Sequence, residues 1–398
     1  MFVAAAANDF PVIARLWAIE ESTNEKLLTI MASSMLVIAT FAVSSMIAAY
    51  ASASTTATPR SFPLIVADDV SQTALSAFIG AFIFSIVALV AVKNGFYDNG
   101  SHFVLFAMTI AVFGWVVLTF VRWVDTIARL GRIRNTIDKV ESAVSSAITR
   151  RRRQPNLGGV ALDEHRDPGR PVYCDTIGYV QQIDMESLQK FAEDHGCRIT
   201  IAAIPGTFLA PDRALAHLTV DGGDASEVDD SKIVGAFMIG KSRVFDDDPR
   251  YGLIVLSEIA SRALSPAVND PGSAIDIIGS FVRLFAAWNE PPKDDEREPP
   301  ACDRVHAPEL AVGDMFDDAF TGLSRDGAMC VEVGVRLQKA FAALASTGAS
   351  DTADAARRHS RRALAQAQRA LSLADDIDAI RHAAGLIDQN SDREAASP

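Results

Sequence analysis

Three apolar runs decide the fold: IMASSMLVIATFAVSSMIAAY at Ile30–Tyr50, LSAFIGAFIFSIVALVAV at Leu75–Val92 and FVLFAMTIAVFGWVVLTFV at Phe103–Val121. No Asp, Glu, Lys or Arg interrupts any of them. An α-helix needs about 20 predominantly apolar residues to cross a bilayer. The three runs therefore predict a transmembrane domain with three spans over residues 30–124.

Composition limits what the remainder can do. The chain has 398 residues and a formal net charge of −13, which argues against general nucleic-acid binding. Its four cysteines are far apart and form no CxxC pair, so neither a zinc site nor a redox motif is indicated. We find no nucleophile–base pair, metal-ligand spacing or cofactor loop. We therefore expect no catalytic residue, metal or cofactor, and an enzyme is the least favoured class.

Residues 1–29 form an N-terminal lead-in with several charges and no signal-peptide pattern. Phe10, Ile13 and Trp17 share one apolar face, so this segment is expected either to lie on the membrane surface or to be frayed.

The first span carries a stripe of hydroxyl residues, Ser33, Thr40 and Ser44, at helical spacing. One interpretation is a wall that faces a polar path or pore. The other is tight helix–helix packing, for which membrane helices use small and hydroxyl residues. Packing is the commoner explanation.

Basic residues near the ends of the spans predict the orientation. Arg122, Arg129, Arg132 and Arg134 follow the third span, whereas the loop between the second and third spans has only Lys93. Because basic residues accumulate on the cytoplasmic side, we expect a multi-pass protein whose C-terminal part is cytoplasmic.

Beyond the third span, apolar residues recur in alternating steps of three and four from Leu130 to Ala147. This heptad pattern predicts that the third helix continues over residues 125–155. Its apolar seam would pack against the cytoplasmic domain or against a second copy. The helix ends in the basic residues Arg150, Arg151, Arg152 and Arg153. They would bind anionic lipid or an acidic surface, or form an ordinary solvated helix end.

A small α/β module is predicted over residues 172–245. Asp184 is expected to cap a helix that runs to Asp194. Strands are expected at Pro171–Val180, Arg198–Ile204, Leu215–Val220 and Lys232–Ile239, with an acidic loop at Asp221–Ser231.

Residues 246–290 predict two helices joined by a turn. Asp248 precedes Pro249, and Asp270 precedes Pro271; Asp at the N-cap followed by Pro is typical of a helix start. A second interpretation combines Asp246–Asp248, Arg250, Asn269 and Asp270 into a cation-binding cluster, because hard cations prefer oxygen ligands. EF-hand spacing is absent, and we favour capping.

The stretch DPRYGLIVLSEIASRALSPAVNDPGSA, Asp248–Ala274, resembles the signature of a bacterial family of predicted membrane proteins, domain of unknown function two-two-five-four. Gly178–Leu218 and Ser33–Arg60 are similar to the same family. The resemblance implies a bacterial inner-membrane location and this architecture, without a known chemistry. The family usually has another span before Ile30, so either that span is lost or the start is late. The signature residues are Asp248, Pro249, Arg262, Ser265, Pro266, Asn269, Asp270 and Pro271.

Residues 312–390 predict a C-terminal helical region after the charged loop Pro291–Pro300. The expected helices are Met315–Leu323, Ala328–Ala345 and Thr352–Ala374, and disorder is expected at Ser391–Pro398.

The predicted fold class is a multi-pass α-helical membrane domain, then a cytoplasmic α+β module, then a C-terminal α-helical region. Two functions fit. The first is an oligomeric channel or transport-like protein with a cytoplasmic assembly or gating domain. The alternative is a membrane-anchored scaffold or sensor whose cytoplasmic domain binds a partner or ligand. The expected partners are the lipid bilayer, a second copy and anionic lipid at Arg150–Arg153, but no nucleic acid.

Overall fold

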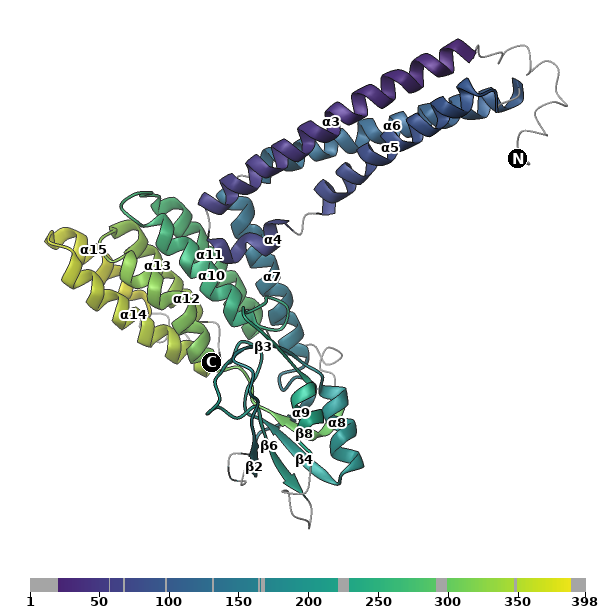
Figure 1. Cartoon of the computed structure of the whole chain (residues 1–398). Coiled ribbons are helices and arrows are strands. Elements are labelled where there is room, and N and C mark those ends of the chain that lie inside the picture. Colours follow the sequence, from purple (N-terminus) through teal and green to yellow (C-terminus); the bar gives the residue numbers. More distant parts are fainter. Residues whose placement is uncertain are drawn as a thin grey trace, which may run out of the picture. The chain divides into compact units, whose positions relative to one another are not determined.

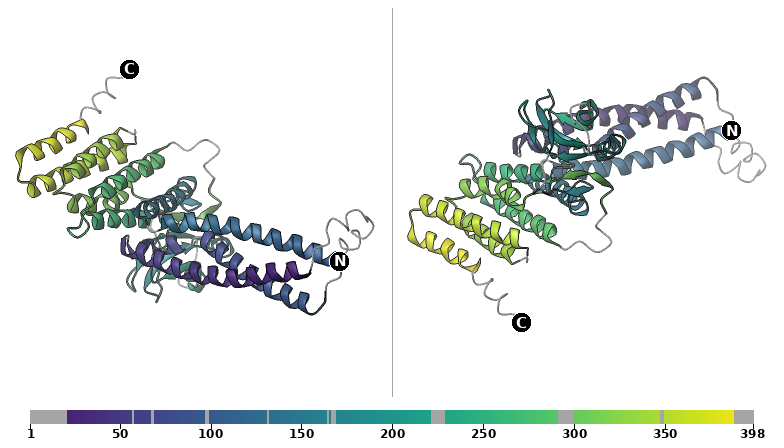
Figure 2. Two further views of the ribbon diagram at one scale, coloured as in Figure 1. Left: turned by 90° about the horizontal axis from the view of Figure 1, so that it is seen from above. Right: turned by 90° about the horizontal axis from the view of Figure 1, so that it is seen from below.

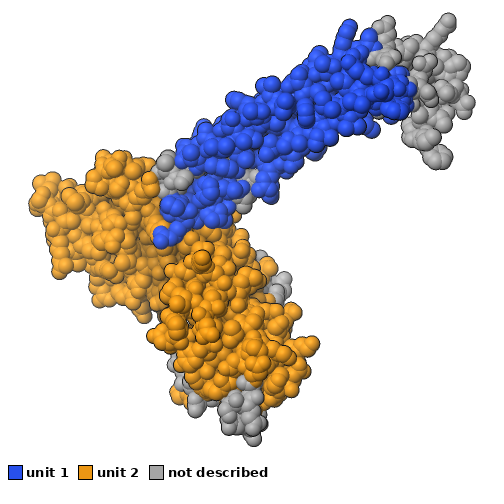
Figure 3. Space-filling model, in the orientation of Figure 1, with its two compact units in different colours: residues 1–136 blue, residues 137–398 orange. Residues whose placement is uncertain are grey.

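The computed structural model (Figure 1, Figure 2) places two compact units along the chain, residues 1–136 and residues 137–398 (Figure 3). The expectations for residues 1–20, for most of the loops 221–231 and 291–300, and for the tail 391–398 lie outside the described residues. The described residues are 21–56, 58–66, 69–96, 99–130, 132–163, 165, 169–220, 229–290, 299–346 and 349–387.

Three long helices run side by side in the first unit (Figure 1). They are α3 (Glu21–Thr56), α5 (Asp69–Lys93) and α6 (Asn99–Leu130). Each contains one of the three predicted spans, and each is long and apolar enough to cross a membrane.

Small side chains allow these helices to pack closely. Ala39 and Ala42 of α3 and Ala74 and Ala81 of α5 are all buried. The ring of Phe78 meets the ring of Trp123 edge-on, with centroids 6.3 Å apart. Large apolar side chains such as Val37 and Leu118 point outward instead, as lipid-facing residues do. The first unit therefore has a largely apolar core.

The connection between α3 and α5 is ordered. A short 3-10 helix, η2 (Pro59–Ser61), precedes α4 (Phe62–Val66). The Thr58 hydroxyl accepts a hydrogen bond from the Arg60 backbone N–H at 3.1 Å, and the buried Ser61 hydroxyl donates to the Thr58 carbonyl at 2.8 Å. Ile65 packs against Ala49 and Tyr50.

The prediction of one continuous helix from the third span to Pro155 is wrong. Helix α6 ends at Leu130, and a separate helix α7 (Ile133–Arg153) follows. The sequence between them contains Gly131, and glycine costs about 1 kcal/mol relative to alanine in a helix interior.

The apolar seam of α7 is buried within the second unit. Val140 and Val144 are 0% and 1% exposed. Gly252 of helix α10 (Pro249–Ala263) lies so close to Val144 that a Cβ at position 252 would collide with it. Glu141 accepts hydrogen bonds from Arg283 and Ser280 of helix α11 (Pro271–Asn289). The seam was expected to pack either against the rest of the chain or against a second copy. In the structure it packs against the rest of the chain.

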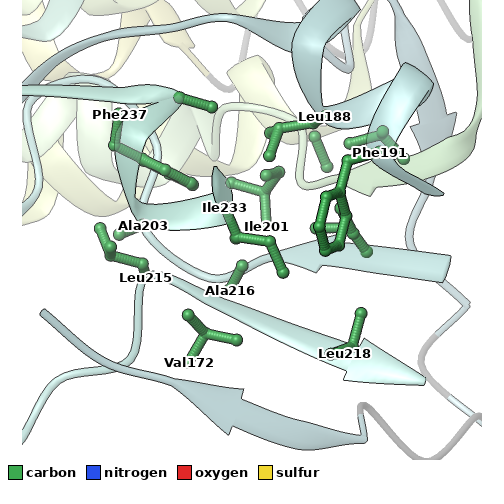
Figure 4. Close-up of a cluster of buried hydrophobic side chains, with 14 of the residues drawn as sticks. Val172, Leu188, Phe191, Ile201, Ala203, Leu215, Ala216, Leu218, Ile233 and Phe237 are labelled. Carbon is green, nitrogen blue, oxygen red and sulfur yellow. The ribbon is translucent and has the colours of Figure 1, made fainter. Parts of the chain in front are cut away.

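The α/β part of the second unit contains two sheets. The five-stranded sheet has the order β1-β8-β4-β6-β2, with β1 and β4 parallel to β8 and with β4 and β2 antiparallel to β6. The three-stranded sheet has the antiparallel order β5-β3-β7. Leu188 and Phe191 of helix α8 pack with Ile201 and Leu218 in the core (Figure 4). The strands are β1 (Gly159–Ala161), β2 (Arg170–Val172), β3 (Gly178–Ile183), β4 (Cys197–Ile201), β5 (Phe208–Leu209), β6 (Ala216–Val220), β7 (Phe237–Gly240) and β8 (Cys302–Ala307), and the helices are α8 (Met185–Asp194) and α9 (Ser231–Gly235).

Two details of the predicted module differ. The strand expected at Pro171–Val180 is divided between β2 and β3, and Lys232–Ile239 contains α9 before β7. The five-stranded sheet also contains β1 and β8, which lie outside residues 172–245. Strand β1 has only three residues, and β8 pairs with strands more than 100 residues earlier, so neither belongs to a hairpin that a local pattern would mark.

The rest of the second unit is helical. Helices α10 and α11 pack with four later helices around an aromatic core that includes Phe281, Phe285, Phe316, Phe320 and Phe341. The helix expected at Thr352–Ala374 ends at Ala370, and a further helix follows. The four later helices are α12 (Val312–Asp326), α13 (Val331–Ala345), α14 (Ser350–Ala370) and α15 (Ala374–Ala384).

Candidate functional site

Charged side chains gather where the C-terminal end of α7 meets the loop before α10. They border a cavity of about 210 Å³, which we call the arginine cavity. Three arginines line it, with one carboxylate. The complete lining is Ala147, Arg150, Arg151, Arg153, Gln154, Leu157 and Asp247.

Arg151 is the unusual member of this group. Its side chain is only 4% exposed, and no described residue accepts a hydrogen bond from its buried Nη1 or Nη2. Burial lowers its pKa to about 10, although the nearby charges of Asp247 and Asp248 act to raise that pKa. The guanidinium is therefore still charged at neutral pH, and a buried charge without hydrogen-bond acceptors is costly.

The charge of Asp248 acts on Arg151, but its carboxylate is hydrogen-bonded to other residues. Its carboxylate caps α10 by accepting a hydrogen bond from the Tyr251 backbone N–H at 3.1 Å. It also accepts two hydrogen bonds from Arg243, at 2.7 and 2.8 Å. The Arg243 guanidinium lies 5.4 Å from the centroid of the Tyr251 ring. Gly206, at φ +91°, lies against this ion pair, and a side chain there would collide with Asp248. Hydrogen bonds from Arg243 and Tyr251 therefore hold the Asp248 side chain in place beside Arg151.

The four basic residues at the end of α7 differ in their surroundings. The Arg150 Nε lies 3.6 Å from a carboxylate oxygen of Asp247. Arg152 donates a hydrogen bond to the backbone carbonyl of Glu290, just after α11. Arg153 is exposed at the rim of the cavity. The run is therefore not a uniform solvated helix end, because Arg151 lies inside the protein.

Backbone strain occurs at the same place. Leu157, which also lines the cavity, has φ +59°. This left-handed conformation is rare for a bulky residue and costs about 1–3 kcal/mol. The turn is held by hydrogen bonds from the Leu157 N–H to the Gln154 carbonyl and from the Asn156 side chain to the Ala307 carbonyl.

The second half of the signature lies at the other end of α10. The Asp270 carboxylate caps α11 through the N–H and hydroxyl of Ser273, with Pro271 in the first turn. The Asn269 N–H donates to the Ser265 carbonyl at 2.9 Å, and Asn269 itself has φ +50°. Arg262 and Pro266 are exposed.

The cation-binding cluster considered from the sequence is not assembled. Asp248 and Asp270 flank the 15 residues of α10, which separate them by about 22 Å at 1.5 Å per residue. The described part of the chain contains no group of three or more His, Cys, Asp or Glu side chains arranged to hold a metal. Arg250 instead joins α10 to α12 through Asp318 and Asp314, at 2.6 and 2.7 Å.

The hydroxyl stripe of the first span faces outward. Ser33, Thr40 and Ser44 are exposed on the surface of the three-helix unit. Each hydroxyl donates to a carbonyl of its own helix; Thr40, for example, donates to the Leu36 carbonyl at 2.9 Å. These residues therefore neither pack between the helices of one chain nor line a path inside it.

Sequence reasoning did not find His359, which is 1% exposed beside Phe316, Phe320 and Phe341. Its Nε2 lies 3.0 Å from a carboxylate oxygen of Asp317. Desolvation lowers its pKa to about 4, against the opposing effect of Asp317. The sequence did offer one indication that His359 is buried. It lies at helical spacing between Ala356 and Ala363, on the buried alanine face of α14.

Comparison with known proteins gives a consistent result. The family model described as "Predicted membrane protein (DUF2254)" matches residues 2–343. Uncharacterized proteins of Mycobacterium tuberculosis (strain H37Rv) and Mycobacterium bovis are each 25% identical over 243 residues, which cover 57% of this chain and 46% of each relative. The chain thus spans about half the length of the curated relatives it matches. No solved structure matches the chain.

Proposed function

Because the chain belongs to the DUF2254 family of predicted membrane proteins, we propose from this premise that it is a membrane-anchored sensor or scaffold. In this proposal the three spans hold the protein in the bacterial inner membrane. The second unit lies in the cytoplasm and binds a ligand or partner.

The observation that carries the proposal is the closely packed, largely apolar core of the three-helix unit. Phe78 and Trp123 are 0% and 2% exposed, and they belong to a cluster of buried apolar side chains. The buried hydroxyls of Ser85 and Thr109 donate to carbonyls of their own helices. Ion paths in membrane proteins are often marked by charged residues, and the three apolar runs contain none. An anchor needs only packing, which the small residues of α3 and α5 supply.

The cytoplasmic assignment rests on charge. Arg122, Arg129, Arg132 and Arg134 cluster at the end of α6 that leads to the second unit. Basic residues close to the end of a span favour the cytoplasmic side. The opposite end of the unit is joined by an ion pair of Glu25 with Lys93 at 3.0 Å and by a hydrogen bond from Asn24 to the His102 carbonyl.

One observation favours the channel as a second candidate. Ser33, Thr40 and Ser44 of α3 are exposed, and so are Ser76 and Gly80 of α5. Small and hydroxyl residues on an outer face suit contact with a second copy. A pore would then lie between copies and not within one.

Ion flux separates the two candidates. The full chain would be purified in detergent, its mass measured by light scattering, and K⁺ flux recorded in liposomes with gramicidin as the positive control. For a sensor or scaffold we expect flux no greater than in empty liposomes. Flux that Thr40→Trp abolishes, and that the matched outward substitution Ile86→Trp on α5 leaves intact, would establish the channel instead.

A further inference from the structure

We propose that the arginine cavity binds the phosphate group of an anionic ligand, with Arg151 as its buried recognition residue. The proposal rests on the proposed function, because it identifies the ligand class that the second unit would bind. The ligand is either a soluble phosphate compound or the headgroup of an anionic lipid, since both present the same group of oxygens.

The first support is the state of Arg151. Two of its guanidinium nitrogens are buried and have no acceptor among the described residues, and the neighbouring Asp248 is already bonded to Arg243 and Tyr251. Proteins seldom keep a buried charge without hydrogen-bond acceptors, because desolvation is then uncompensated. An anion beside the guanidinium would supply both charge and acceptors.

The second support is the chemistry of the lining. Arg150, Arg151 and Arg153 come from one turn at the end of α7, and Asp247 is the one carboxylate among the described lining residues. The guanidinium fork matches phosphate oxygens, and several forks can engage one phosphate at once. A carboxylate offers fewer oxygens to three arginines, so phosphate is the better match.

The third support is size. About 210 Å³ corresponds to roughly seven water molecules at about 30 Å³ each. This is enough for a phosphate and the first atoms attached to it. Leu157, strained at φ +59°, forms part of the same wall, and backbone strain concentrates at ligand sites.

Thermal unfolding of the full chain in a non-ionic detergent tests the site. Inorganic phosphate would be titrated against sodium chloride at equal ionic strength. We expect a saturable rise of the melting temperature with phosphate only, since a ligand that binds the native state stabilises it. Loss of one charged hydrogen-bonding group should weaken the apparent affinity about 10- to 100-fold in Arg151→Gln. The exposed Arg361→Gln on α14 is the matched control and should respond as wild type does.

Arg151→Met separates binding from a structural role. Without phosphate it should melt at a higher temperature than wild type, because it removes a buried charge that lacks acceptors. It should also lose the phosphate response. A lower melting temperature together with an intact response would overturn the proposal. If the Met variant fails to fold, Arg150→Gln and Arg153→Gln at the rim test the same cavity, and an unchanged phosphate affinity in both would equally overturn it.

Nanodiscs distinguish the two sources of phosphate. In phosphate-free buffer, melting in phosphatidylglycerol nanodiscs would be compared with melting in phosphatidylcholine nanodiscs. An Arg151-dependent rise in phosphatidylglycerol identifies the lipid headgroup, whereas a rise with inorganic phosphate alone identifies a soluble ligand. No Arg151-dependent response in either arm refutes the site. Ion flux would refute the sensor or scaffold and leave the phosphate response unaffected, so the two failures are distinguishable.

Discussion

The hydroxyls within the three spans and the carboxylates of the second unit are satisfied in different ways. In the first unit, the hydroxyls of Thr40, Ser85 and Thr109 donate to carbonyls four residues earlier in the same helix. In the second unit, Asp248 and Glu141 are engaged by residues of other segments. Lipid offers no hydrogen bonds, so polar groups within a span are most readily satisfied inside their own helix. The carboxylates of the second unit instead form hydrogen bonds between elements, and such networks can also hold a ligand.

The largest expected effect breaks one such network. Asp248→Ala removes a helix cap and leaves Arg243, which is mostly buried, without its partner. We expect a loss of about 3–5 kcal/mol in the free energy of unfolding, measured by denaturant titration of the full chain. The exposed neighbour Asp246→Ala should change it by less than about 0.5 kcal/mol. Equal effects of the two substitutions would contradict the assigned network.

His359 should contribute to the acid sensitivity of the second unit. Its pKa of about 4 in the folded chain lies below the ordinary 6.5. Between these two pH values the His359 side chain is protonated in the unfolded chain but mostly neutral in the folded chain. Its contribution to stability is therefore complete above pH 6.5, declines as pH falls and is lost by about pH 4. The difference corresponds to roughly 3 kcal/mol. Denaturant unfolding between pH 7.5 and pH 4 should be less steeply pH-dependent in His359→Gln than in wild type. Parallel curves would rule out this assignment.

A smaller effect is expected at the second helix cap. Asp270→Ala should destabilise the second unit by about 1 kcal/mol, because α11 loses the carboxylate that accepts from the Ser273 N–H and hydroxyl. Asp270→Asn, which keeps a capping oxygen, should retain most of the stability in the same unfolding experiment. If Asn and Ala were equally harmful, the ionic charge and not the cap would be responsible.

The smallest effect is expected for a hydroxyl in the first unit. Thr40→Val removes a hydroxyl whose described hydrogen bond is to the Leu36 carbonyl of the same helix. We expect a change below about 0.5 kcal/mol and an unchanged mass of the detergent-solubilised complex. A change in mass would mean that the outer face of α3 contacts a second copy, which would strengthen the channel candidate.

Local patterns predicted those features that depend on neighbouring residues. Apolar run length gave the three helices, and Asp before Pro gave the starts of α10 and α11. The interior strand β8 was missed because its partners lie far away in the chain. The arginine run was visible in sequence, but periodicity cannot tell which one of four consecutive arginines is buried. That depends on how Gly252 and Val144 bring α7 and α10 together.

The position of β8 has a consequence for biosynthesis. It lies between β1 and β4, but it follows helices α10 and α11 in the chain. From Gly159 to Ala307 is a difference of 148 positions, so at about 5–20 residues per second the ribosome needs roughly 7–30 s to deliver this strand. During that interval β1, and later β4 once it has been made, lack their shared neighbour and expose pairing edges. These edges are then accessible to chaperones and proteases.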